Sequence, residues 1–202
     1  MKIVIRLVLL VVIFVLGYFV VESIMQPVRF NKEKDKRAEV VIQKLEDIRA
    51  AELAYKAVNG RYMADWDTLI SFVRDNEFPI IKEVADPNDT TNTLIIRDTI
   101  GYMPIADSLY NHRIGFNVEH MKYVPLPKEF FDNETFKLQA GTIERGGLPV
   151  HVFECSVGYP IILKGMDKQS IINLDKKLGE MNKYAGLKVG SMTEASTEGN
   201  WK

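Results

Sequence analysis

The chain has 202 residues, of which 47% are hydrophobic and 26% charged, and its net charge is -1. This near-neutral balance argues against a nucleic-acid partner, which needs a concentrated basic face to neutralise phosphates. The lone cysteine, Cys155, excludes an internal disulfide and a cysteine-based zinc site, and its apolar, strand-like surroundings predict a buried thiol.

The N-terminus carries an apolar run that predicts a transmembrane anchor over residues 1–26. Residues 7–21 are uncharged, and their apolar neighbours extend the run to about twenty residues, the length of a membrane-spanning helix. A cleaved secretory signal is the alternative, because it has the same basic start and apolar core. Small residues are scarce where a peptidase would cut, which favours the uncleaved anchor.

Basic residues flank the apolar run on both sides, so the charge bias alone does not set its orientation. A folded domain after a single N-terminal anchor is most often exported. We therefore expect a single-pass protein of the inner (cytoplasmic) membrane with a periplasmic head. The basic cluster at residues 29–37 is expected to meet anionic lipid headgroups.

A long amphipathic helix is predicted to follow over residues 27–60. Pro27 should kink it where it leaves the anchor, and Asn59-Gly60 should end it. Its apolar residues recur every three or four positions and form one face: Ala38, Val41, Leu45, Ile48, Ala51 and Tyr55. The other positions are expected to carry the charged residues Lys36, Glu39, Lys44, Glu46, Asp47, Arg49 and Glu52.

A head of mixed structure is predicted over residues 61–191. Asp65 can cap a short helix that Phe78-Pro79 would end, and Gly141–Gly147 encloses a hairpin turn. Strands are expected at 93–97, 99–103, 122–124, 135–139, 150–157 and 161–164. A helical or irregular segment at 166–181 closes the head, and residues 192–202 are expected to be a loosely held tail. The expected fold class is α+β, with a transmembrane helix continuing into a long helix packed on a small, mainly antiparallel sheet.

The order of features in residues 7–74 is an apolar helix, Pro27, a basic turn, an amphipathic helix, Tyr-Lys-x-x-Asn-Gly-Arg-Tyr at 55–62, and a short helix. This succession resembles the long-helix region of type II secretion pseudopilins and type IV pilins. The family's processing site and membrane glutamate are missing, since Gly17 precedes Tyr18 and no acid lies between Arg6 and Glu22. The resemblance implies a pilin-like shape held as a permanent anchor. The remainder resembles uncharacterised envelope proteins of Gram-negative bacteria, which implies no activity.

No residue is assigned a catalytic, cofactor-binding or metal-binding role. A loop offers four oxygen ligands that suit calcium but lacks a closing glutamate, which favours a plain turn: Asp86, Asn88, Asp89 and Asn92. The histidines are dispersed and form no zinc motif: His112, His120 and His151. The carboxylates of one further group form no evident pair for hydrolysis: Asp132, Glu134 and Asp175.

The aromatic residues of the head offer either a binding surface or core packing, and the core is favoured for most: Tyr102, Tyr110, Tyr123, Phe130, Phe131 and Phe136. The function favoured is a membrane-anchored, non-catalytic structural or scaffolding component of a pilus- or secretion-like envelope assembly, with protein partners and no cofactor. A membrane-tethered peptide- or ligand-binding module is the alternative. An enzyme is disfavoured, because no nucleophile and base can be named.

Overall fold

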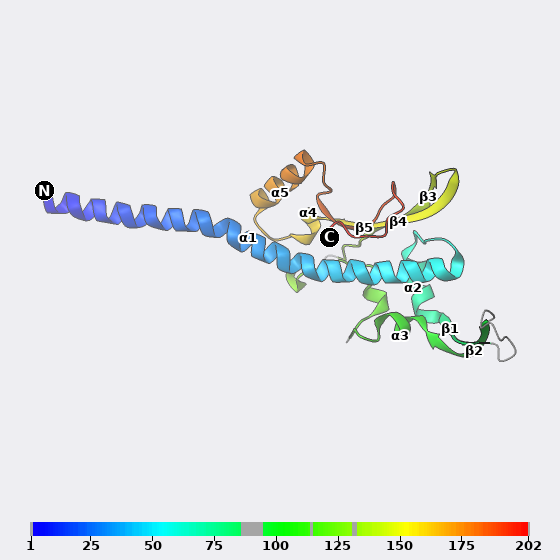
Figure 1. Ribbon diagram of the computed structural model, residues 1–202. Helices are drawn as coiled ribbons and strands as arrows, with labels where there is room; N and C mark the ends of the chain where they lie inside the picture. The colour runs from blue at the N-terminus through cyan, green and yellow to red at the C-terminus, as the bar shows by residue number, and fades with distance from the viewer. Residues whose placement is uncertain (1, 86–94, 114, 131–132, 202) are drawn as a thin grey trace.

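The computed structural model describes residues 2–85, 95–113, 115–130 and 133–201. Helix α1 (Lys2–Asn59) runs without interruption through Pro27, so the predicted anchor and the predicted second helix form one element. Its N-terminal half projects from the head, and its direction changes as it enters the head (Figure 1). The helix ends at Asn59 as expected, because Gly60 takes a φ of 75° that glycine adopts without strain.

The C-terminal half of α1 lies between two layers (Figure 1). One layer is an antiparallel sheet of order β3-β4-β5, formed by β3 (Lys137–Arg145), β4 (Leu148–Gly158) and β5 (Gly186–Gly190). The other contains α2 (Trp66–Asp75), α3 (Ile105–Tyr110) and a two-stranded hairpin of β1 (Glu77–Ala85) and β2 (Ile95–Pro104). The predicted α+β class with small antiparallel sheets is therefore confirmed.

The core forms on both sides of α1. Val41, Leu45, Ile48 and Ala51 are fully buried, and Tyr55 is nearly so, which confirms the predicted apolar face. The two layers pack on opposite sides of α1 and contribute the buried residues Leu69, Ile70, Val73, Ile105, Phe136, Phe153 and Leu187. Each large apolar side chain buried in this way stabilises the fold by about 1.5 to 3 kcal/mol. The head thus depends on α1 as its central element.

The short helix α2 and the hairpin turn agree with the sequence-based expectations. The Asp65 carboxylate accepts a hydrogen bond from the Thr68 amide at 2.8 Å and caps α2. Strands β3 and β4 are joined at Gly146 and Gly147, whose φ values of 60° and 78° suit a two-residue hairpin turn. Helix α5 (Lys168–Glu180) occupies the segment expected to be helical or irregular.

Two predicted strands are wrong. In the segment 161–164, residues 161 and 162 end a short helix, α4 (Tyr159–Ile162), and residues 163 and 164 form a turn, because Pro160 suits a first helical turn and a short apolar run fits either structure. Residues 122–124 contribute only an isolated bridge between Tyr123 and Thr135. The described residues of the segments 93–97 and 99–103 are strand, as predicted, but they belong to the single strand β2 rather than to two separate strands. Phe78 and Pro79 follow α2 as expected, but they lie in strand β1, which the sequence did not predict.

The C-terminal tail was expected to be loosely held, but it is hydrogen-bonded to β5. The Asn200 side chain accepts a hydrogen bond from the Lys188 amide and donates one to the Gly186 carbonyl, each at 3.0 Å. The Gly190 amide donates to the Glu198 carbonyl, also at 3.0 Å. The tail therefore covers the outer edge of β5 and satisfies backbone groups that an uncovered edge strand would expose. Two short 3-10 helices, η1 (Val118–His120) and η2 (Lys128–Phe130), complete the described elements.

Candidate functional site

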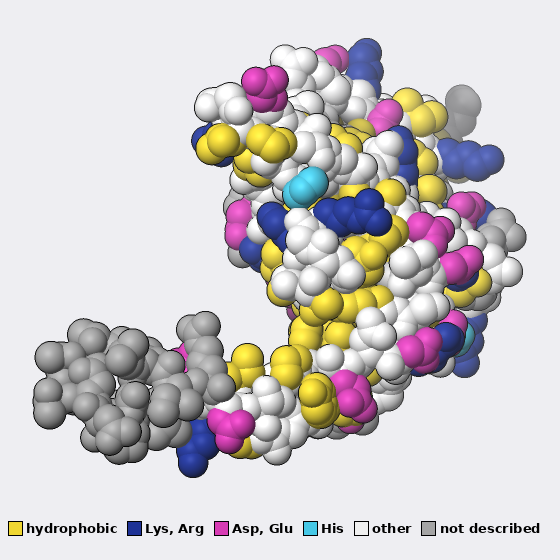
Figure 2. Space-filling view, turned by 90° about the vertical axis from the view of Figure 1, so that its right-hand side faces the viewer, with side chains coloured by type: hydrophobic (Ala, Val, Ile, Leu, Met, Phe, Trp, Pro, Cys, Tyr) yellow, Lys and Arg dark blue, Asp and Glu magenta, His cyan; other side chains and the backbone are white. Residues whose placement is uncertain are grey.

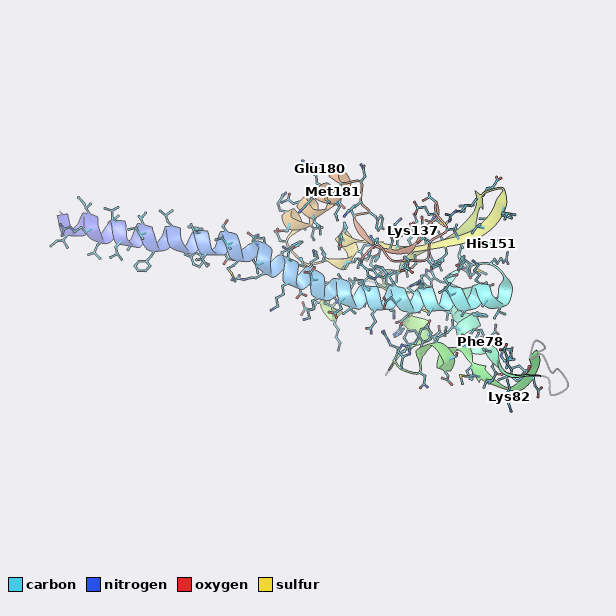
Figure 3. All side chains as sticks on the ribbon, in the orientation of Figure 1. Phe78, Lys82, Lys137, His151, Glu180 and Met181 are labelled. Carbon is cyan, nitrogen blue, oxygen red and sulfur yellow. The ribbon has the colours of Figure 1, made fainter. Side chains whose placement is uncertain are left out.

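The residues considered for metal or acid-base chemistry do not come together. The loop with Asp86, Asn88, Asp89 and Asn92 lies outside the described residues. His120 is exposed beside Tyr123, whereas His151 lies on the sheet, where its Nδ1 is 2.9 Å from the Thr142 hydroxyl (Figure 3). Among the residues that the structure describes, no group of three His, Cys, Asp or Glu side chains could hold a metal ion.

Cys155 is fully buried in β4, as its sequence context predicted. Burial raises the pKa of its thiol well above the ordinary value, and the nearby Glu52 carboxyl raises it further. A thiol reacts as the thiolate, so this cysteine is chemically inert in the folded chain. Of the two described acids in the remaining carboxylate group, Glu134 lies 3.8 Å from Lys164, and Asp175 lines a separate cavity beside α5.

The sequence placed Asp47 and Glu52 on the solvent-facing side of α1, and the structure buries both. Asp47 accepts a hydrogen bond from the Arg113 guanidinium at 2.9 Å, and its backbone carbonyl accepts one from the Tyr110 hydroxyl at 2.7 Å. Burial raises the pKa of the Asp47 carboxyl, although Arg113 opposes this rise. The pair fastens α1 to the segment that follows α3.

Glu52 is fully buried and only half satisfied. Its Oε2 accepts a hydrogen bond from the Met63 amide at 3.0 Å, and Oε1 has no hydrogen-bond partner among the described residues. Burial raises the pKa of this carboxyl to about 7, against the smaller, opposing effect of the Met63 hydrogen bond. Its position could have been found from the sequence, because Leu45, Ile48, Glu52 and Tyr55 follow the three-and-four spacing of one helix face.

The aromatic residues divide between the core and the surface. Tyr110 and Phe136 are buried, as expected, and Tyr123 and Phe130 are half-buried. Phe131 lies outside the described residues. Tyr102 differs from the rest, because 67% of its surface is exposed on strand β2. This tyrosine is one of several exposed apolar residues on the hairpin.

We use the name hairpin surface for the exposed apolar residues of the hairpin and the nearby Val58: Val58, Ile81, Ile100, Tyr102 and Met103. Tyr102 and Met103 are neighbours along β2 and lie on opposite faces of the hairpin, and Tyr102 and Val58 line the same groove. Strands β1 and β2 pair only with each other among the described residues, so each keeps one free edge. Beside them lies a groove of about 370 Å³, lined in part by Val58, Phe72 and Tyr102. Exposed apolar clusters with an aromatic anchor are typical of protein-binding surfaces.

Figure 3 shows where the hairpin lies in the molecule, and Figure 2 shows the end of the head beside it. The hairpin, with Phe78 and Lys82, lies on the opposite side of α1 from the sheet that carries His151 (Figure 3). Figure 2 faces the end of the head that points away from the N-terminal half of α1, and hydrophobic side chains gather across the middle of this end. The sequence did not predict this surface, because it missed strand β1 and assigned most of the aromatic residues to the core.

The N-terminal half of α1 carries the second exposed apolar surface. It contains the one helix segment of the described chain that is long and apolar enough to be a candidate membrane span, a property that signal sequences share. Comparisons with protein-family models, curated proteins and solved structures give no match to this chain. The pilin-like resemblance therefore stays a prediction.

Proposed function

We propose that this chain is a membrane-anchored, non-catalytic structural component of a bacterial envelope assembly, whose head binds a protein partner. The observation that carries the proposal is the exposure of the apolar run. The large hydrophobic side chains between Leu7 and Val21 are each 45% to 72% exposed, all round the helix. A helix that is apolar on every side is stable only inside a larger protein or in a bilayer.

The features of the head favour a binding role over a catalytic one. Its buried acids, Asp47 and Glu52, are enclosed in the core, and its single thiol is inaccessible. The hairpin surface, in contrast, offers Tyr102 and neighbouring apolar side chains to a partner. The order of anchor and folded domain favours placement in the inner membrane with a periplasmic head, and the pilin-like succession supports an envelope assembly.

Membrane fractionation tests the anchor. We expect the chain to stay in the membrane pellet through carbonate and high-salt washes and to keep its original N-terminus, because apolar burial rather than charge holds it. Release by salt alone, or a mature N-terminus at or beyond Tyr18, would contradict the anchor. Protease treatment of spheroplasts tests the orientation, since a periplasmic head is digested while the inner membrane remains closed.

Site-specific photo-crosslinking in intact membranes tests the partner-binding role. A photoreactive amino acid at Tyr102 should give a discrete crosslinked product. The same group at Leu148, which is 69% exposed at the β3–β4 turn, is the matched control and should give none. Tyr102→Asp should weaken the association without unfolding the head, because this side chain already faces solvent. Equal crosslinking at both positions would argue against the hairpin surface.

A peptide-binding module is the second candidate, and the free edges of β1 and β2 favour it. An extended peptide can add a strand to such an edge and place a side chain in the groove beside Tyr102. The two functions differ in their ligand. A folded partner buries the apolar face of the hairpin, whereas a peptide protects backbone amides of one edge strand from hydrogen exchange.

A further inference from the structure

Helices α4 and α5 lie at the end of the head from which the N-terminal half of α1 projects (Figure 1). Side chains of α1 hold them there. The Arg37 guanidinium donates hydrogen bonds to the carbonyls of Lys164, at 2.9 Å, and Ile162, at 3.4 Å. Phe30, which lies one helical turn nearer the N-terminus than Lys34, packs against the core cluster. The head therefore begins only a few residues after the apolar run.

The spacing along α1 sets the depth of this end of the head. Met25 closes the extended apolar run, and Phe30 follows it by about 7.5 Å along the helix axis at 1.5 Å per residue. The polar headgroup layer adds about 5 to 8 Å on each side of the hydrocarbon core. When the run fills the hydrocarbon core, as proposed above, the part of the head that packs near Phe30 is level with the lipid headgroups.

The side chains at this end suit such a position. A cavity of about 500 Å³ beside α4 and α5 has mainly apolar walls, which include Met166, Ile171 and Ile172. Ile172 is 58% exposed. Lys164 and Lys168 also line the cavity, and the acid among its lining residues is Asp175. Apolar side chains flanked by lysines are the chemistry of a surface that binds anionic lipid.

We propose that this α4–α5 surface, defined by Lys164, Met166, Lys168, Ile171 and Ile172, rests on the bilayer and binds an anionic phospholipid. Lys168 contacts the phosphate, Lys164, whose Nζ lies 3.8 Å from Glu134, adds positive charge beside it, and the upper acyl chain lies against the apolar cavity wall. The inference depends on the membrane anchor proposed above. Its consequence is a fixed orientation of the head, because contact at this end directs the hairpin surface away from the membrane.

Fluorescence of the full chain in lipid vesicles tests the contact. Single cysteines replace Val12, Leu148 or Ile172 in a Cys155→Ala background, and each carries a polarity-sensitive fluorophore. We expect a blue-shifted emission at 12 and 172, and a water-like emission at 148. A blue shift at 12 with a water-like signal at 172 overturns the present inference and leaves the anchor standing. A water-like signal at 12 overturns the anchor itself, and the inference with it.

Charge reversal tests the lipid class. In vesicles that contain phosphatidylglycerol, Lys168→Glu should lower the ratio of docked to undocked heads by about five-fold or more. A glutamate in the first turn of α5 is favourable for the helix, so the variant should fold. Lys82→Glu, on the exposed hairpin, is the matched control and should change nothing. Equal docking of both variants, or equal docking of the native chain on phosphatidylcholine alone, overturns the assignment to anionic lipid.

Discussion

The buried carboxyl of Glu52 predicts that the head loses stability as the pH rises through neutrality. In the folded chain its pKa is about 7, because burial disfavours the charged form, whereas the ordinary value is 4.5. Between these two pH values the folded chain keeps a proton that the unfolded chain has released. Stability therefore falls from about pH 4.5 to about pH 7, and the loss is complete above the folded pKa.

The size of this effect follows from the pKa difference. The shift to about 7 corresponds to a free-energy loss on the order of 3 kcal/mol above neutral pH. Glu52→Gln removes the charge and keeps an oxygen that can accept the Met63 amide hydrogen bond. At pH 8 the variant should exceed the native chain in melting temperature by about 6 to 12 °C. At pH 4.5 or below the two should be nearly equal.

Thermal unfolding in detergent, followed by tryptophan fluorescence, measures this difference. Trp66 reports on the head, since its indole donates a hydrogen bond to the Phe136 carbonyl at 3.1 Å. Glu46→Gln is the control, because Glu46 is exposed on the same helix and should leave the pH profile unchanged. A constant difference between the Glu52→Gln variant and the native chain from pH 5 to pH 8 would refute the reasoning.

Three further predictions concern the core, the thiol and assembly. Leu45→Asp should unfold the head, because it places a charge in a fully buried position. Glu46→Lys should change the unfolding free energy by no more than about 0.5 kcal/mol. Equal melting temperatures of the two variants would contradict this prediction. Cys155 should react with a thiol reagent only after denaturation, because it is buried. Rapid labelling of the native chain would show that the thiol is accessible in the folded head. The chain should not polymerise into filaments, because the apolar half of α1 lacks an acid between Arg6 and Glu22. Electron microscopy of sheared surface fractions tests this, and filaments labelled by an antibody to the head would contradict a fixed anchor.

The parts of the fold that were predictable are those in which a few neighbouring residues decide the structure. The apolar face with Leu45 and Ile48, the Asp65 cap and the Gly146-Gly147 turn each follow from local spacing or backbone preference. Strand β1 was missed because Pro79 is typical of a chain break, yet Pro79 lies on a strand whose second edge is free. Helix α4 was missed because a short apolar run fits a strand equally well.

The candidate site was less predictable, because it depends on which elements cover α1. A helix packed on one sheet buries one stripe, and Asp47 would then flank that stripe, whereas Glu52 lies within it. Here the sheet covers one side of α1, and α2 and α3 cover the other (Figure 1), so the buried stripe widens and takes in Asp47 as well. The hairpin surface was unpredictable for a related reason, because it depends on strands β1 and β2 of that second layer, and β1 was not predicted.

The continuity of α1 links the anchor to the surfaces of the head. The same uninterrupted helix supplies the candidate membrane span and the central buried element, so with the proposed anchor the head would turn relative to the membrane only where α1 bends. The segment between Met25 and Phe30 is the place for such a bend, because Pro27 removes a backbone hydrogen bond there and the head begins to pack at Phe30. Lipid contact at the α4–α5 surface would restrain that bend. A partner at the hairpin surface would then meet a head that is held at a fixed height and in a fixed direction, which would suit the scaffolding role proposed above.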